Sequence, residues 1–102
     1  MKPSETLEMH REMIREILSR YPVSNPRIFG SVARGEDTEA SDLDILVKLD
    51  TQPNAATSLT LMDLARLQIE LQKATDRRID VSLEDGFSQR VLERLSRSAI
   101  AL

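Results

Sequence analysis

Residues 27–49 read RIFGSVARGEDTEASDLDILVKL, and this stretch decides the fold of the 102-residue chain. In its second half, residues 42–49, apolar side chains occupy every second position from Leu43 to Leu49. Asp42 and Asp44 fall on the other side of the same alternation. This period of two predicts a strand with one buried face and one polar face. A shorter strand is predicted over residues 27–29, ending at Gly30, and the polar, turn-rich residues 31–41 connect the two strands.

Working outward, helical spacing predicts three helices around these strands. The first begins with Ser4 as N-cap and ends before Pro22, because proline disfavours helical geometry in the preceding residue. Its apolar stripe is Leu7, Ile14, Ile17, Leu18 and Tyr21. A loop over residues 50–57 leads to a leucine-rich helix over residues 58–74. The last helix is capped by Asp85, with a stripe of Phe87, Val91, Leu92 and Leu95.

Two more strands complete the predicted order. Residues 78–83 alternate again, and residues 100–102 could add a short edge strand. The order helix, strand, strand, helix, strand, helix predicts an α+β fold, a small mixed β-sheet with helices packed on it.

Length and composition exclude several classes of protein. The 102 residues suit one domain over residues 1–102. Fourteen basic and seventeen acidic residues give a net charge of −3, so bulk charge does not attract nucleic acid. There is no cysteine, hence no disulfide or thiolate metal site. No apolar run approaches the roughly 20 residues that cross a bilayer, and no signal peptide is evident. We expect a cytoplasmic protein.

The chemistry is expected at Asp42 and Asp44. Two residues apart on a strand, their Cα atoms lie roughly 6.5–7 Å apart on one face. Carboxylates so placed can share divalent cations, and magnesium prefers such hard oxygen ligands. The alternative is an ordinary solvated strand face.

Gly30 and Ser31 favour the metal interpretation. A strand that ends in Gly-Ser and turns into a helix start presents unpaired backbone N–H groups, which bind phosphate. Arg34 could add a cation to the same phosphates. Asp80, on the polar face of the strand over residues 78–83, could complete a cluster of three aspartates and accept a proton. Pairing of Asp80 with Arg77 or Arg78 is an equally good interpretation.

The spacing Gly30-Ser31, ten residues, Asp42-Leu43-Asp44 resembles the signature of the DNA polymerase beta-like nucleotidyltransferases. The short chain and its local sequence around these motifs are similar to those of the minimal nucleotidyltransferases, the MntA-type antitoxins paired with HEPN-domain toxins. The segment Arg78-Ile79-Asp80-Val81 resembles the family's third-aspartate strand.

This resemblance implies transfer of AMP from ATP, with two magnesium ions, to a hydroxyl, in MntA-type members a tyrosine of the HEPN partner. It implies that Gly30, Ser31 and Arg34 hold the triphosphate. Asp42, Asp44 and Asp80 would hold the metals, with Asp80 as base.

Two other functions stay open at this point: a non-catalytic antitoxin that neutralises its partner by occlusion, and a nucleotidyltransferase for a small molecule. Larger relatives carry a second domain for the acceptor, so a partner protein is expected to supply that surface. The leucine arc Leu61, Leu64, Leu67 and Leu71 is the candidate contact.

Overall fold

One mixed sheet organises the structure, a computed structural model that describes residues 1–49 and 61–102 apart from the Leu61 side chain. The strand order is β3-β2-β1-β4. β1 runs antiparallel to both β2 and β4, whereas β2 and β3 are parallel. The strands are β1 (Val23–Phe29), β2 (Leu43–Leu49), β3 (Ile79–Leu83) and β4 (Ile100–Ala101).

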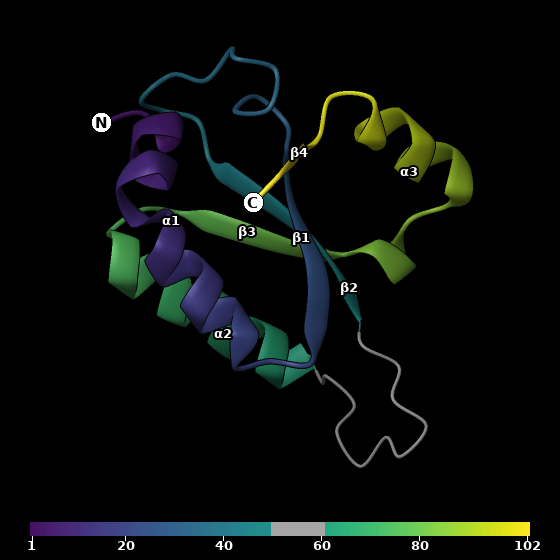
Figure 1. Cartoon of the computed structure of the whole chain (residues 1–102), viewed down its shortest axis with the longest axis horizontal. Helices are drawn as coiled ribbons and strands as arrows, with labels where there is room; N and C mark the ends of the chain where they lie inside the picture. The colour runs from purple at the N-terminus through teal and green to yellow at the C-terminus, as the bar shows by residue number, and fades with distance from the viewer. Residues whose placement is uncertain (50–60) are drawn as a thin grey trace.

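The helices lie on both sides of this sheet (Figure 1). They are α1 (Pro3–Ser19), α2 (Leu61–Thr75) and α3 (Gln89–Ser96), with a short 3₁₀ turn, η1 (Glu84–Gly86), after β3. α1 and α2 lie side by side on one side of the strands, and α3 lies on the other. The observed order confirms the predicted α+β fold, the strand at the C-terminal end included. Among the described residues, no helix has both the length and the apolar character needed to cross a bilayer.

The core lies between the sheet and the pair α1 and α2. The alternating side chains of β2 on this side, Leu43, Ile45 and Val47, are fully buried, as the period of two predicts. Four residues of the predicted stripe, Leu7, Ile14, Ile17 and Leu18, pack into the same core from α1, whereas Tyr21 follows the end of the helix at Ser19 and packs against the core partly buried. The core members from the helices and β3 are Leu7, Ile14, Ile17, Leu18, Leu67, Leu71, Ile79 and Val81.

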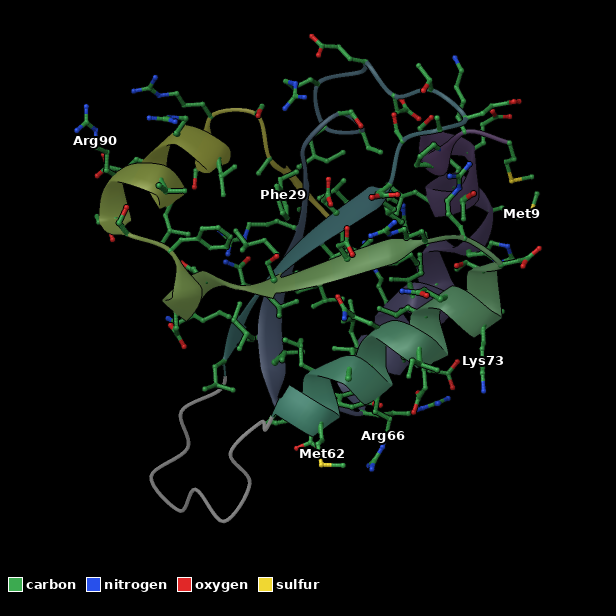
Figure 2. The ribbon with its side chains drawn as sticks, turned by 180° about the vertical axis from the view of Figure 1, so that it is seen from behind. Met9, Phe29, Met62, Arg66, Lys73 and Arg90 are labelled. Carbon is green, nitrogen blue, oxygen red and sulfur yellow. The ribbon has the colours of Figure 1, made fainter. Side chains whose placement is uncertain are left out.

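The leucine arc of α2 is therefore not a partner surface, and that prediction is wrong. Leu67 and Leu71 are fully buried in the core, and Leu64 packs partly buried against it. Leu61 cannot be judged, because its side chain is outside the described part of the chain. The outer side of α2 instead carries Met62, Arg66 and Lys73, which point away from the sheet (Figure 2). A broad apolar arc was needed because α2 packs against both α1 and β3.

Two glutamines on α2 bind the exposed edge of the sheet. Gln68 accepts a hydrogen bond from the Val81 N–H (2.8 Å), and Gln72 donates one to the Ile79 carbonyl (3.1 Å). β3 is an edge strand, so these backbone groups have no neighbouring strand on that side. The glutamines thus satisfy polar groups of β3 from inside the apolar arc.

Several predicted boundaries shift. The N-cap of α1 is Lys2 rather than Ser4, because Pro3 occupies the first helical turn, where its missing N–H costs nothing. The N-cap of α3 is Ser88, whose hydroxyl accepts from the Val91 N–H, whereas Asp85 lies in η1.

Differences in the strands and connections are smaller. β1 begins at Val23, before the predicted position, and passes through a bulge where Asn25 has φ +51°. The segment after Gly30 is a turn rather than a helix start. α2 extends to Thr75, but the predicted loop 50–57 and helix start at residue 58 lie outside the described residues.

Candidate active site

The three predicted aspartates lie at one end of the sheet, Asp44 and Asp80 on adjacent strands and Asp42 directly before β2. In the register of the strands, Asp44 lies opposite Phe29 of β1 on one side and Asp80 of β3 on the other. Directly opposed residues share a face of the sheet, so the Asp44 and Asp80 carboxylates stand on neighbouring strands. Asp42 directly precedes β2, two residues before Asp44. The strand of Asp80 thus lies beside that of Asp44, which is the arrangement that would let Asp80 complete the predicted cluster.

The opposite end of this face is closed. Leu46, the next residue of β2 on the Asp44 side, is fully buried although a polar face was predicted there. η1 packs against β2, and Arg27 of β1 forms an ion pair with Glu84 of η1 (2.9 Å). Both of these side chains are mostly buried. The covering of Leu46 leaves the aspartate end as the accessible part of the face.

Gly30 lets the backbone approach the Asp44 carboxylate closely. Its φ is +76°, a left-handed value that glycine adopts without penalty. A Cβ at this position would lie 2.6 Å from Oδ2 of Asp44. Gly35 has a similar φ of +70°, yet a Cβ there would meet nothing within 4 Å. Two glycines thus turn the chain, and only Gly30 borders the aspartates.

The turn after Gly30 offers backbone donors next to these carboxylates. It closes with hydrogen bonds from Arg34 N–H to the Gly30 carbonyl (3.2 Å) and from Glu36 N–H to the Ser31 carbonyl (2.9 Å). Within the described part of the chain, the N–H groups of Ser31, Val32 and Ala33 have no hydrogen-bond partner. Successive free N–H groups in a turn form a concavity suited to anions. The unpaired N–H groups that the sequence predicted are therefore present, but in a turn and not at the start of a helix.

Arg34 stands at the edge of the same region. Its guanidinium is half-exposed and pairs with Glu36 (3.1 Å). Its charge nevertheless acts on Asp44, because it lowers the pKa of that carboxyl. Arg34 therefore lies close enough to Asp44 for its charge to act there, although its guanidinium pairs with Glu36 and not with an aspartate.

Asp44 is the electrostatic centre of the cluster. Partial burial raises its pKa above the ordinary value of 3.8, and the neighbouring charges of Asp80 and Asp42 raise the pKa further. Only Arg34 opposes these effects. Three acidic groups that repel one another in this way favour a bound cation.

Arginine contacts distinguish the two remaining aspartates. Arg78 approaches Asp42 (Nε to Oδ2, 3.7 Å), an exposed pair and hence a weak one. Neither Arg77 nor Arg78 pairs with Asp80 in the described structure. The alternative role of Asp80 as an arginine partner is therefore wrong. Both arginines directly precede β3. Arg78 therefore lies near Asp42, and Arg77 binds the carbonyl of the preceding Ser41. The sequence pattern did not indicate either contact.

The donor set suits a hard divalent cation. The described residues hold no group of three acidic or histidine side chains already converged on one point. The fit therefore lies in the donor chemistry: carboxylate oxygens on adjacent strands, whose mutual repulsion a cation would relieve. Magnesium prefers such ligands and keeps several waters as well, so it does not need a closed protein cage.

Comparison with known proteins gives the family of this fold and site. The family model described as "Nucleotidyltransferase domain" matches residues 10–102. The chain belongs to this family. It is therefore an enzyme of the nucleotidyltransferase class, as the resemblance implied.

Relatives and solved structures agree with this assignment. A relative from Methanocaldococcus jannaschii that bears the name protein adenylyltransferase is 33% identical over 93 residues, covering 91% of this chain and 92% of its own. The protein adenylyltransferase MntA of Thermococcus cleftensis is 32% identical, covering 87% and 85%.

A solved structure described as a minimal nucleotidyltransferase superposes with a TM-score of 0.79 at 39% identity, covering 97% of this chain and 95% of that one. The same fold is found in an MNT antitoxin–HEPN toxin complex from Shewanella oneidensis, in which the toxin is tri-AMPylated. That match has a TM-score of 0.66 at 18% identity and covers 92% and 69% of the two chains.

Proposed function

We propose that this chain is a magnesium-dependent adenylyltransferase that moves AMP from ATP to a tyrosine hydroxyl of a HEPN-domain toxin, and so acts as the antitoxin of the pair. The observation that carries the proposal is the row of Asp44 and Asp80 on adjacent strands, with Gly30 against Asp44. The adenylyltransferase name of relatives that match most of the chain supports AMP as the transferred group. We further propose the cytoplasm, which supplies ATP, as the compartment.

The residues divide the work of binding. Gly30 and Ser31 hold the triphosphate through the free N–H groups of their turn, and Arg34 adds a positive charge. Asp42, Asp44 and Asp80 would hold two magnesium ions. When bound, these ions would neutralise the charge that develops on the attacking and leaving oxygens.

The chemical step is a displacement at phosphorus. The acceptor hydroxyl oxygen forms a bond to the α-phosphorus of ATP, and the bond between that phosphorus and the bridging oxygen to the β-phosphate breaks. Pyrophosphate leaves with the bridging oxygen. The proton of the hydroxyl passes to the Asp80 carboxylate, which serves as general base. Atoms and charge balance without any further reactant.

The test compares two neighbouring carboxylates of the chain. Asp80→Asn removes the proposed base, whereas Asp85→Asn removes an exposed carboxylate of η1 outside the site. Each variant is incubated with a purified HEPN-domain protein and ATP labelled at the α- or the γ-phosphate. We expect the α-label alone to enter the toxin, with the wild type and Asp85→Asn but not with Asp80→Asn. Intact-mass spectrometry then counts the added AMP units.

Other outcomes would overturn the proposal. Neutralisation of the toxin by Asp80→Asn without AMP transfer would establish occlusion instead. Incorporation of the γ-label would mean phosphoryl rather than adenylyl transfer. An adenylylated small product in place of labelled toxin would establish a small-molecule enzyme.

A further inference from the structure

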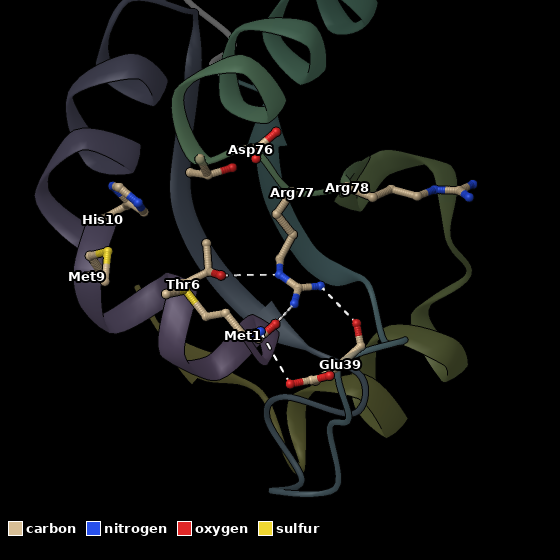
Figure 3. Close-up of a pocket in the computed structure, with 9 residues that line it drawn as sticks. Met1, Thr6, Met9, His10, Glu39, Asp76, Arg77 and Arg78 are labelled. Carbon is tan, nitrogen blue, oxygen red and sulfur yellow. Dashed lines mark hydrogen bonds and ion pairs between the residues drawn. The ribbon is translucent and has the colours of Figure 1, made fainter.

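A groove of about 620 Å³ lies beside the aspartates rather than over them. It is bounded by the start of α1, by Glu39 and by residues 75–78, where α2 passes into β3 (Figure 3). Arg77 reaches across it and is half-buried. Its guanidinium is used entirely for contacts within the chain, so the groove contains a junction between segments rather than an unpaired cation.

Arg77 binds four backbone or hydroxyl oxygens from two separate segments, residues 1–6 and residues 39–41. Its Nε donates to the Thr6 hydroxyl of α1 (3.2 Å), and its Nη2 donates to the carbonyl of Met1. Its Nη1 donates to the carbonyls of Ser41 (3.0 Å) and Glu39 (3.5 Å). A planar guanidinium can serve these separate directions at once, whereas the single ammonium of lysine cannot hold the same set of angles.

Two hydrogen bonds fix the backbone on either side of Asp42, and one of them comes from the Arg77 side chain. The carbonyl of Ser41, directly before Asp42, accepts from Arg77. The N–H of Leu43, directly after it, donates to the carbonyl of Arg78 (3.3 Å). Asp42 lies outside the regular strand, so the sheet alone does not set the position of its backbone.

The far side of the connecting segment is tied down as well. Asp37 accepts a hydrogen bond from the Ser4 N–H at the start of α1 (3.0 Å), and Thr38 and Ser41 close a turn with each other. Thr38 and Arg77 therefore both hold Ser41, the residue directly before Asp42, and of these two only Arg77 also binds α1, through the Thr6 hydroxyl. Arg77 therefore links the buried start of α1 to the entrance of the aspartate site.

We propose that Arg77 is a positioning residue that holds Asp42 in place to bind the divalent cation. This inference rests on the proposed function, because it assumes that Asp42 is a metal ligand. Residues that orient a metal ligand from outside the ligand set typically change metal affinity 10–100-fold when they are mutated. We therefore expect loss of Arg77 to lower the affinity for the metal.

The test measures Mn²⁺ binding by electron paramagnetic resonance, which detects the free ion, in the absence of ATP and toxin. Arg77→Met is expected to weaken binding about 10-fold or more, and Arg77→Lys is expected to lie between it and the wild type. Thr6→Val provides a milder second variant that keeps the shape of a buried side chain while removing the acceptor for Nε. It should weaken binding in the same direction.

Arg15→Met is the matched control. Arg15 also donates hydrogen bonds to a backbone carbonyl far along the chain, that of Leu102 (Nε, 2.7 Å), but remote from the aspartates. Both variants lose a tether, and circular dichroism and thermal melts establish that each is folded at the assay temperature. Only Arg77→Met should change Mn²⁺ binding; Arg15→Met should stay within about twofold of the wild type.

Three results decide the matter. Wild-type affinity in Arg77→Met and in Thr6→Val would overturn the positioning role. An equal loss in Arg15→Met would show that stability alone is responsible and would overturn it too. A wild type that binds no Mn²⁺ and transfers no AMP would instead reject the proposed function on which the inference rests.

Discussion

Replacing Gly30 by alanine separates the two demands that this position meets. The first is its left-handed backbone, which costs an L-residue roughly 1–2 kcal/mol. The second is the close approach to Asp44, where the new Cβ would lie 2.6 Å from Oδ2. To restore an ordinary contact of 3.4 Å, that oxygen must retreat by about 0.8 Å, the difference between the two distances. The carboxylate can rotate at modest energetic cost, but it then leaves its place in the aspartate row.

The same substitution at Gly35 meets only the first demand, so the difference between the two variants measures the second. Gly35 has nearly the same φ, and a Cβ added there would meet nothing within 4 Å. Both variants should therefore lose roughly 1–2 kcal/mol, or roughly 4–16 °C in Tm for a domain of this size. Only Gly30→Ala should lose catalysis, because a misplacement near 1 Å of a reacting group costs about 10²-fold.

The assay measures AMP transfer to the toxin at saturating ATP, well below the lower of the two melting temperatures. We expect kcat to fall about 10²-fold in Gly30→Ala and to stay within about twofold of the wild type in Gly35→Ala. Equal rates in the two folded variants would refute the claim that Gly30 is required by the Asp44 carboxylate. A much larger loss of Tm in Gly30→Ala would mean that the clash is absorbed by the backbone instead.

Three further predictions concern stability. Burial and Asp80 hold the pKa of Asp44 above its unfolded value, so the stability from its extra proton is present at low pH and lost as pH rises through that pKa. In EDTA at neutral pH, Asp44→Asn should therefore raise the free energy of unfolding by roughly 0.2–1 kcal/mol, because opposed like charges are relieved. Its Tm should be higher than that of the wild type, and an unchanged or lower Tm would contradict this. The hydrogen bond from the Ser4 N–H lowers the pKa of Asp37, so the stability that this carboxylate contributes is present at neutral pH and lost as pH falls through the lowered pKa. The difference in Tm between Asp37→Asn and the wild type should therefore shrink on acidification. A difference that does not change with pH would contradict this role of Asp37. Gln72→Leu should cost roughly 0.5–1.5 kcal/mol in urea unfolding through the lost hydrogen bond to the edge of β3, and wild-type stability would contradict that role.

Much of the fold could be predicted because its signals are local. The alternation of β2 is complete on its core side, and it correctly predicted which face is buried. The same pattern in β3 correctly predicted a strand with Asp80 on its polar face, and the register of the sheet puts that residue opposite Asp44. These features depend on neighbours in sequence and on the rule that a strand–helix–strand unit is parallel.

The errors come from features that depend on the rest of the chain. Leu46 falls on the polar face by alternation, yet it is fully buried in a sheet where η1 packs against β2, and nothing near Leu46 in the sequence indicates this. The predicted caps were wrong because several polar residues near each helix end could serve, and the path of the incoming chain selects among them. The sequence indicated Arg77 only as a partner for Asp80, because its true acceptors are backbone carbonyls and a hydroxyl from distant segments.

The parallel pairing of Asp44 with Asp80 has a consequence for folding. Because successive side chains of a strand point to opposite faces, a slip of β3 by one residue would turn Asp80 toward the helices and Ile79 toward water. Such a misregistered chain would bury a charge and empty part of its core simultaneously. The register that places Asp80 opposite Asp44 is therefore also the one that keeps Ile79 in the core, so the correctly folded sheet already has its carboxylates on adjacent strands.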